Sequence, residues 1–181
     1  LSWSSVEATF ELSVPFEDYF KLIGRPFDDI MDELGLSDQA DQIKSVYDVA
    51  SSCRLDLIDT YENCLDVVER IKKMGLRIGI VTSKDKTRTL EIIKRYNLLF
   101  DVVECPEAKE RGKPNPDPLF RAMLKCQRDP SETLYIGDMD VDMEAARRAG
   151  IDYIHADWGY GNCGIDVIRA LIPDDLLELI I

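Results

Sequence analysis

The chain has 181 residues, of which 45% are hydrophobic and 31% are charged. This length suits one ordinary domain or a domain with a small insert, and the composition is that of a globular protein with a buried core, which excludes a disordered chain. The formal net charge of −13 argues against nucleic acid and anionic membranes as partners, because like charges repel.

Cysteine usage and the first residues bear on the compartment. The 5 cysteines include no Cys-x-x-Cys pair, so we expect reduced thiols rather than a disulfide framework or a zinc site. No apolar run approaches the roughly 18 residues of a membrane span, and residues 1–5 do not resemble a signal peptide. These features predict a cytoplasmic protein.

Residues 1–52 have the apolar spacing of short helices. Apolar side chains recur every three or four positions, with breaks at Pro15, Gly24 and Gly35. The same stretch holds eleven acidic and three basic residues, which we interpret as a solvated helix face rather than a binding surface. We expect a helical subdomain here.

From residue 53 onward, short apolar runs alternate with helical patterns. The sequence predicts helices over 62–74, 86–96, 117–125, 141–149 and 165–171, and strands over 76–81, 102–103, 134–136 and 153–154. Strands separated by single helices imply right-handed crossovers. The expected fold class is therefore α/β, with a doubly wound parallel sheet (a Rossmann-like core) over residues 53–181 and an N-terminal helical subdomain.

Hydroxyl side chains follow the first predicted strand of this core. In an open parallel sheet, ligands bind beyond the carboxyl ends of the strands. Thr82 and Ser83 occupy that position before a helix, where hydroxyls and free backbone N–H groups can hold a phosphoryl oxygen. Such residues are also common helix N-caps, so both interpretations stay open.

Carboxylates follow the strand predicted at 134–136. Asp138, Asp140 and Asp142 would repel one another unless a divalent cation neutralised them, and oxygen ligands suit Mg²⁺. The four-residue step from a strand tip to the first helical turn favours Asp138 and Asp142 as ligands. Asp140 is expected to assist only the helix start.

A proline-rich loop lies between these two sets. Residues 112–118 contain three prolines, which hold Lys113 in a stiff, extended segment. An ammonium fixed near a metal site offsets the charge of a dianionic ligand.

Three segments together resemble the second, third and fourth motifs of the haloacid dehalogenase superfamily. They are residues 78–84 (IGIVTSK), 112–116 (GKPNP) and 135–151 (YIGDMDVDMEAARRAGI). Residues 156–161 (ADWGYG) also resemble the substrate-side loop of phosphoglycolate-phosphatase-like members. By this resemblance, residues 1–52 would be the family's helical cap.

The resemblance implies a role for each matching residue. Thr82 would hydrogen-bond the transferring phosphoryl group, and Lys113 would steady the nucleophile and the phosphoryl charge. Asp138 would ligate Mg²⁺ directly, and Asp142 directly or through water. In the family, an aspartate of the first motif attacks phosphorus.

The first motif, an apolar strand followed by Asp-x-Asp-Gly-Thr/Val, is not found in these residues. Asp56 and Asp59 lack the following Gly-Thr, so neither is a candidate nucleophile. We expect either that the sequence is a truncated record of an active phosphatase, as the missing initiator methionine favours, or that it is a natural noncatalytic remnant. Without that strand, a gap at the centre of the sheet is expected.

Three further features carry weaker expectations. Arg25 is the best candidate in the cap for contacting an anionic substrate, with a surface turn as the alternative. His155 is the single histidine and is expected to be structural or to lie at the rim of the crevice. Residues 158–161 either line the crevice or pack as a loop.

The function expected is Mg²⁺-dependent hydrolysis of a small phosphorylated metabolite, with phosphoglycolate phosphatases as the most similar subgroup. The alternatives are a β-phosphoglucomutase-like phosphotransferase, a phosphonatase, or a noncatalytic binding module. A monomer or a homodimer fits equally well.

Overall fold

The computed structural model describes residues 1–107, 111–164 and 166–180. The chain folds as two compact units, Leu1–Asp59 and Thr60–Ile181. The boundary expected between residues 52 and 53 lies inside the first unit, which also takes in the short 3-10 helix η2 (Leu55–Leu57).

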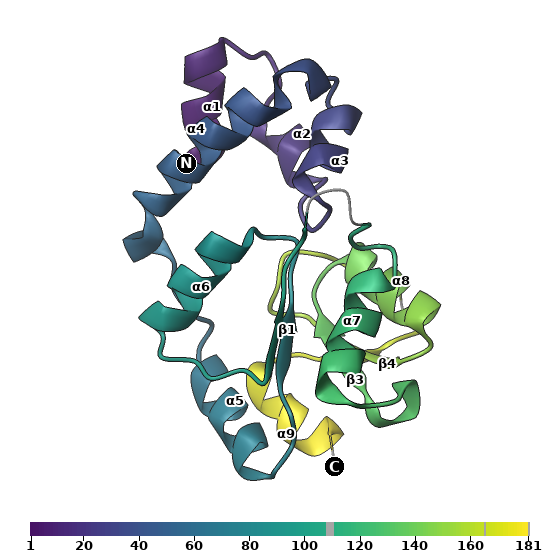
Figure 1. The fold of residues 1–181 in the computed structure, drawn as a ribbon. Helices are drawn as coiled ribbons and strands as arrows, with labels where there is room; N and C mark the ends of the chain where they lie inside the picture. Colours follow the sequence, from purple (N-terminus) through teal and green to yellow (C-terminus); the bar gives the residue numbers. More distant parts are fainter. Residues whose placement is uncertain (108–110, 165, 181) are drawn as a thin grey trace. The chain divides into compact units, whose positions relative to one another are not determined.

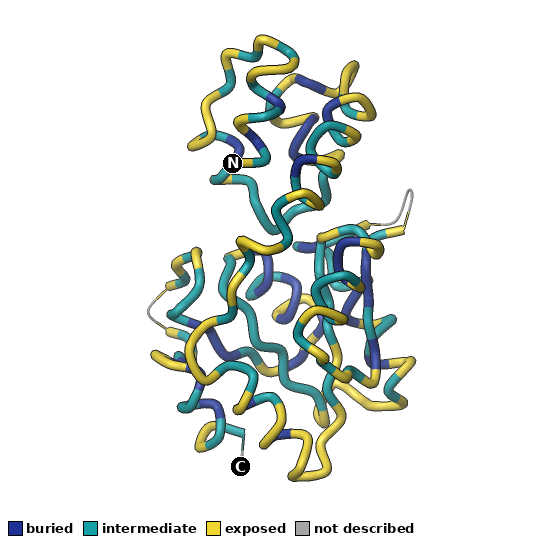
Figure 2. Tube along the Cα trace, turned by 90° about the vertical axis from the view of Figure 1, so that its left-hand side faces the viewer, coloured by how far each residue is buried: buried dark blue, intermediate teal, exposed yellow. Residues whose placement is uncertain are grey.

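The first unit consists of helices around an aromatic core. Trp3 and Tyr19 stack with their ring centroids 4.2 Å apart, and the indole N–H of Trp3 donates to the carbonyl oxygen of Val14. Val6 and Ile43 are fully buried in the same cluster. Buried stretches, dark blue in Figure 2, occur in both units. The helices are α1 (Ser2–Phe10), α2 (Phe16–Phe20), α3 (Phe27–Glu33), η1 (Ser37–Gln39) and α4 (Ala40–Ser52).

The second unit alternates helices and parallel strands, as predicted, which confirms the α/β fold class (Figure 1). Its strands are β1 (Gly79–Val81), β2 (Val102–Glu104), β3 (Leu134–Gly137), β4 (Asp152–Ala156) and β5 (Ile168–Ala170). Its helices are α5 (Cys64–Lys73), α6 (Lys86–Arg95), α7 (Asp117–Cys126), η3 (Pro130–Glu132), α8 (Asp140–Ala149), η4 (Pro173–Asp175) and α9 (Leu176–Leu179).

The described strands form two parallel sheets, β1-β2 and β3-β4-β5. Each pair joined by a helix is parallel, as right-handed crossovers require. In the described part of the chain, no strand pairing joins β1 to β3.

The prediction of a helix over 165–171 is wrong. Residues Ile168–Ala170 form β5, which pairs in parallel with β4 and places Ile168 opposite Ile154. Ile165 lies outside the described residues. Pairing with β4 fully buries Ala170, and β-branched Val167 and Ile168 suit a strand better than a helix.

Helices cover both faces of the larger sheet. Tyr135 and Tyr153 pack on one face against α7 and α8, whose buried side chains include Met123 and Ala145. Alternate residues of β3 and β4 turn to the other face, where Ile154 of β4 packs with residues of α5, β5 and α9, namely Val67, Ile71, Ala170 and Leu176. This is the doubly wound arrangement, with one core on each side of the sheet.

Among the described residues, no helix is both long enough and apolar enough to cross a membrane.

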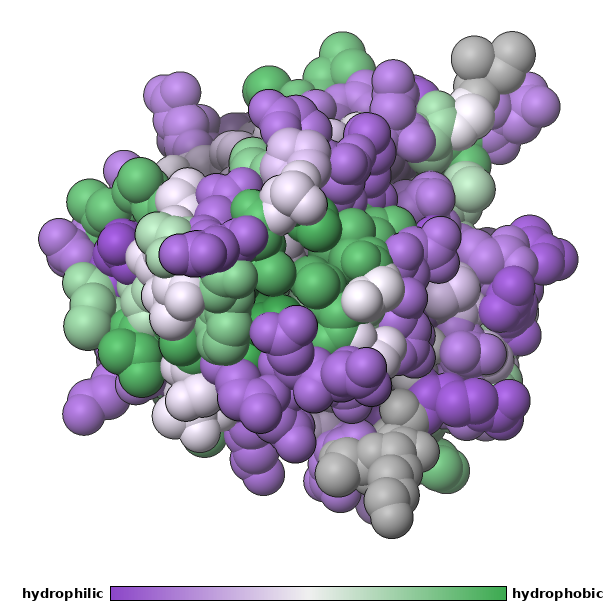
Figure 3. Space-filling view, turned by 90° about the horizontal axis from the view of Figure 1, so that it is seen from above, coloured by the Kyte–Doolittle hydropathy of each residue, from purple (hydrophilic) through white to green (hydrophobic). Residues whose placement is uncertain are grey.

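The face drawn in Figure 3 has an apolar area surrounded by hydrophilic side chains.

The two isoleucines paired across β4 and β5 provide a matched test of this core. Ile154 is 2% exposed and Ile168 is 58% exposed. Ile154→Ala is expected to lower the free energy of unfolding by about 2–4 kcal/mol, because it removes contacts and leaves a cavity. Ile168→Ala is expected to cost less than about 1 kcal/mol. Urea unfolding measures both, and equal losses would contradict this packing.

Candidate active site

The carboxyl ends of β1 and β3 carry the side chains that the sequence singled out. Thr82 and Ser83 follow β1, and together with Lys113 they line one small cavity. The alternative that these hydroxyls cap α6 is wrong, because the N-cap is Asp85, whose carboxylate accepts from the N–H of Arg88 at 2.9 Å.

The backbone of Thr82 is held by the neighbouring strand. Its N–H donates to the carbonyl oxygen of Glu104, and its hydroxyl accepts from the N–H of Lys84 at 3.1 Å. The hydroxyl hydrogen of Thr82 is not needed for the Lys84 contact, so it can be donated to an oxygen in the cavity.

Lys113 and Asp142 form a buried ion pair. The ammonium lies 2.6 Å from Oδ1 of Asp142, and the two side chains are 8% and 5% exposed. The hydroxyl of Tyr135 lies 3.1 Å from the same ammonium and donates to the same carboxylate oxygen at 2.9 Å. Burying such a pair is costly unless its hydrogen bonds are satisfied, so this geometry fixes the lysine in place.

Tyr135 stays a hydrogen-bond donor in this cluster. Burial raises the pKa of Tyr135 well above its ordinary value, and the charge of Asp142 adds to the rise. The phenol therefore keeps its proton at neutral pH. Sequence reasoning missed this residue, although a tyrosine within an apolar strand was the available signal.

The two candidate metal ligands have different surroundings. Asp142, in the first turn of α8, accepts from Lys113 and Tyr135 at Oδ1 and from the N–H of Met139 at Oδ2, 3.1 Å away. Asp138 accepts the N–H of Tyr160 at Oδ2, 2.8 Å away, and no hydrogen bond from the described residues reaches its Oδ1. Asp138 thus has the greater capacity for an external ligand.

Asp140 has the modest role expected of it. It is exposed, and its carboxylate accepts the N–H of the next residue, Val141, at 2.8 Å in the first turn of α8. Within the described ranges, no group of three or more His, Cys, Asp or Glu side chains is arranged to hold a metal ion.

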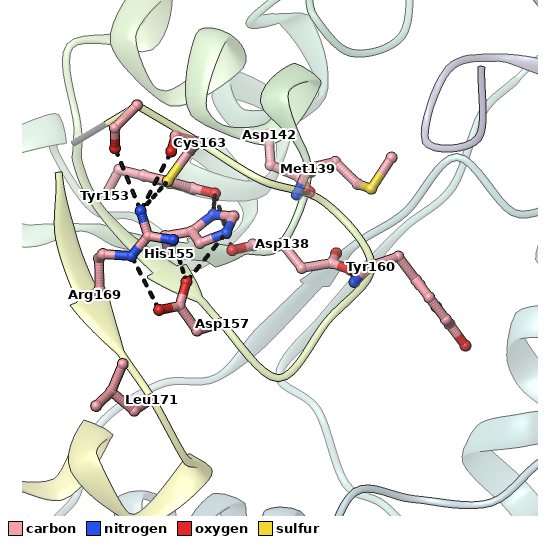
Figure 4. Close-up of polar contacts among 12 residues, drawn as sticks. Asp138, Met139, Asp142, Tyr153, His155, Asp157, Tyr160, Cys163, Arg169 and Leu171 are labelled. Carbon is pink, nitrogen blue, oxygen red and sulfur yellow. Dashed lines mark hydrogen bonds and ion pairs between the residues drawn. The ribbon is translucent and has the colours of Figure 1, made fainter. Parts of the chain in front are cut away.

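The segment 158–161 packs directly over Asp138 (Figure 4). A Cβ atom on Gly159 would overlap the side chain of Asp138, and one on Gly161 would overlap its carbonyl oxygen. Only glycine permits this approach. The loop therefore belongs to the site, and it shapes the position of the carboxylate.

Two other expected residues lie elsewhere. Arg25 is in the first unit, where its guanidinium lies 3.8 Å from Glu33, so its contact with substrate stays a prediction. His155 is completely buried on β4, as a structural role predicts, and its Nδ1 atom lies 3.0 Å from the hydroxyl of Tyr153.

The close packing over Asp138 can be tested with two glycines of the same loop region. Gly159→Ala should lower the free energy of unfolding by about 1–3 kcal/mol, because the loop or Asp138 must move. Gly164 has no atom within 4 Å of the position that a Cβ would take, so Gly164→Ala should change it by less than about 0.5 kcal/mol. Urea denaturation of both variants measures the difference. A loss for Gly164→Ala as large as that for Gly159→Ala would contradict the packing.

Comparisons with known proteins agree with this geometry. Residues 3–156 match the profile of the haloacid dehalogenase-like hydrolase family. The pyrophosphatase PpaX of Halalkalibacterium halodurans is 29% identical over 182 residues, covering 97% of this chain and 83% of that protein. The PpaX of Bacillus mycoides is 29% identical over 165 residues, covering 90% and 75%.

Solved structures give the same assignment. A candidate phosphoglycolate phosphatase from Lactobacillus plantarum superposes with a TM-score of 0.84 at 28% identity, covering 96% of this chain and 86% of that one. A hydrolase from Pseudomonas syringae shares the fold, with a TM-score of 0.86 at 22% identity over 99% and 88%. With most of its length matched, and with the motif residues gathered at the ends of parallel strands, the chain belongs to the haloacid dehalogenase-like hydrolase family.

Proposed function

We propose that this protein is a Mg²⁺-dependent phosphatase that hydrolyses a small organic phosphate. The observation that carries the proposal is the contrast between two aspartates at one strand end. Asp142 accepts hydrogen bonds at both oxygens, from a buried lysine, a tyrosine and a backbone N–H, whereas Oδ1 of Asp138 receives none from the described residues.

The donor set fits Mg²⁺. This ion keeps several of its waters and binds proteins through one or two carboxylates together with substrate phosphate. Asp138 would hold it directly, and Asp142 would act through a water molecule. When bound, the ion would polarise the phosphoryl oxygens and offset their charge.

Lys113, Thr82 and Ser83 would receive the phosphoryl group. All three line the same cavity, and the ion pair with Asp142 leaves the ammonium little freedom to move. A fixed positive charge and fixed hydroxyls stabilise the charge that develops on phosphoryl oxygens, with no reorganisation during the reaction.

The proposed chemistry also needs a nucleophile. The expected group is an aspartate carboxylate that attacks phosphorus while the bond to the departing alcohol oxygen breaks and that oxygen takes a proton; water then cleaves the aspartyl-phosphate. The printed sequence has no Asp-x-Asp-Gly segment, and Asp56 and Asp59 belong to the first unit. The proposal therefore names no nucleophile among residues 1–181.

The relatives named pyrophosphatase supply a second substrate to assay. Inorganic diphosphate has a terminal phosphoryl group like that of an organic monoester. Its leaving group would be phosphate instead of an alcohol. A preference for diphosphate over organic monoesters would change the substrate class in this proposal without changing the roles of Asp138 and Lys113.

The proposal is tested with p-nitrophenyl phosphate and the protein expressed from its full reading frame. Hydrolysis is expected to require Mg²⁺ and to stop with EDTA. Asp138→Ala should lower kcat by on the order of 10²–10³, the size seen when a charge-stabilising group is lost. Asp140→Ala is the matched control and should stay within a few-fold of the wild type.

Two outcomes would contradict the proposal. One is the absence of Mg²⁺-dependent hydrolysis of any phosphate ester or diphosphate, which would favour a noncatalytic binding module. The other is an equal loss for the two aspartate variants.

A further inference from the structure

Arg169 fastens both ends of the loop that covers Asp138. From β5, its Nε and Nη2 atoms bond the two carboxylate oxygens of Asp157 at 2.9 and 2.6 Å (Figure 4). Its Nη1 atom donates to the carbonyl oxygens of Cys163 and Gly164 at 3.2 and 3.4 Å. One guanidinium thus joins the start of the loop to its end, a geometry that needs the planar fork of arginine.

The same loop makes the contact that orients Asp138. Between Asp157 and Cys163, the N–H of Tyr160 donates to Oδ2 of Asp138, and the N–H of Gly159 donates to the carbonyl oxygen of Ala156. The residues between the two fastened ends form no helix or strand. The ion pair of Arg169 with Asp157 restrains this segment, together with the packing of Trp158 in the core.

The pair of His155 and Tyr153 lies between Asp157 and the strand end. Oδ1 of Asp157 lies 3.6 Å from Nε2 of His155, whose Nδ1 shares a hydrogen bond with the hydroxyl of Tyr153. That hydroxyl donates to the carbonyl oxygen of Gly137 at 2.9 Å, directly before Asp138. Asp157 thus lies next to the side chains that hold the backbone before Asp138, without a hydrogen bond to them.

The ion pair is strong enough to act as a restraint. Hydrogen bonds from Arg169 hold the pKa of Asp157 below its ordinary value, so the carboxylate stays charged throughout the neutral range. Two parallel charge-assisted bonds fix direction as well as distance. Groups outside the direct ligands of a metal commonly set its affinity by orienting those ligands.

We propose that Arg169 and Asp157 are positioning residues, which hold the 157–164 loop so that Tyr160 aims the Asp138 carboxylate for Mg²⁺. This inference rests on the proposed function, because it concerns the ligand assigned there. In this proposal, neither residue contacts the substrate or the ion. Their effect reaches Asp138 through the loop backbone. Substitutions at Arg169 or Asp157 should therefore change the affinity for Mg²⁺ more directly than the rate of the chemical step.

The test uses a fluorescent residue inside the loop. The chain has 2 tryptophans, so a Trp3→Phe background leaves Trp158 as the single indole, adjacent to Asp157. In this background, Arg169→Gln should increase acrylamide quenching of Trp158. It should also raise the Kd for Mg²⁺, measured by calorimetry, by about 10- to 100-fold. Asp157→Asn should do the same, and the double variant should add little to either.

Two variants serve as controls. Arg147→Gln removes another two-nitrogen pair, with Glu144 on α8 at 2.7 Å for both bonds, and should change neither readout. Arg169→Lys keeps the positive charge but loses the planar guanidinium that makes two parallel bonds. It should give a Mg²⁺ affinity between those of the wild type and Arg169→Gln. It also keeps the test valid if Arg169→Gln fails to fold.

The outcomes separate this inference from the proposed function. If the wild type binds no Mg²⁺, the proposed function fails, and unchanged quenching in Arg169→Gln would separately overturn the fastening of the loop. If quenching rises while the Kd for Mg²⁺ is unchanged, Arg169 is only a structural residue and the positioning role is overturned.

Discussion

The buried ion pair between Lys113 and Asp142 is the constraint on which the rest of the site depends. It joins the proline-rich loop to the first turn of α8, and Tyr135 of β3 completes it from the sheet. A charge buried to this degree tolerates little displacement, because losing its partner would leave the other charge unsatisfied. Three separate segments of the chain are thereby held in one arrangement.

This arrangement assigns different roles to two aspartates that lie four positions apart. Both carboxylate oxygens of Asp142 accept hydrogen bonds from the protein, and one of them pairs with the Lys113 ammonium. Asp138, in contrast, accepts a single backbone N–H. The protein carries a net charge of −13, and in the proposed function Lys113 and Mg²⁺ would offset the charge of a phosphate locally. The surroundings of Asp138 and Asp142, rather than their residue type, thus distinguish the two carboxylates.

Much of this architecture could be predicted from local patterns. Alternating apolar runs and helices predict the parallel α/β core, and the structure places Thr82 and Asp138 directly after β1 and β3, while their roles stay predictions. The sequence pattern predicts a helix where the strand Ile168–Ala170 forms: β-branched residues favour a strand there, but the strand forms only through pairing with β4. The contacts of Arg169 and Tyr153 could not be predicted from the sequence, because they join residues that come together only through tertiary packing.

The most direct test of the central claim is the location of a bound divalent ion. Mn²⁺ shares the oxygen preference of Mg²⁺ and can be located by its anomalous scattering in a crystal of the protein. We expect one Mn²⁺ ion at about 2.1 Å from Oδ1 of Asp138, with Lys113 still paired to Asp142. A Mn²⁺ ion bound elsewhere with Asp138 unliganded, or one that displaces Lys113 from Asp142, would contradict this claim.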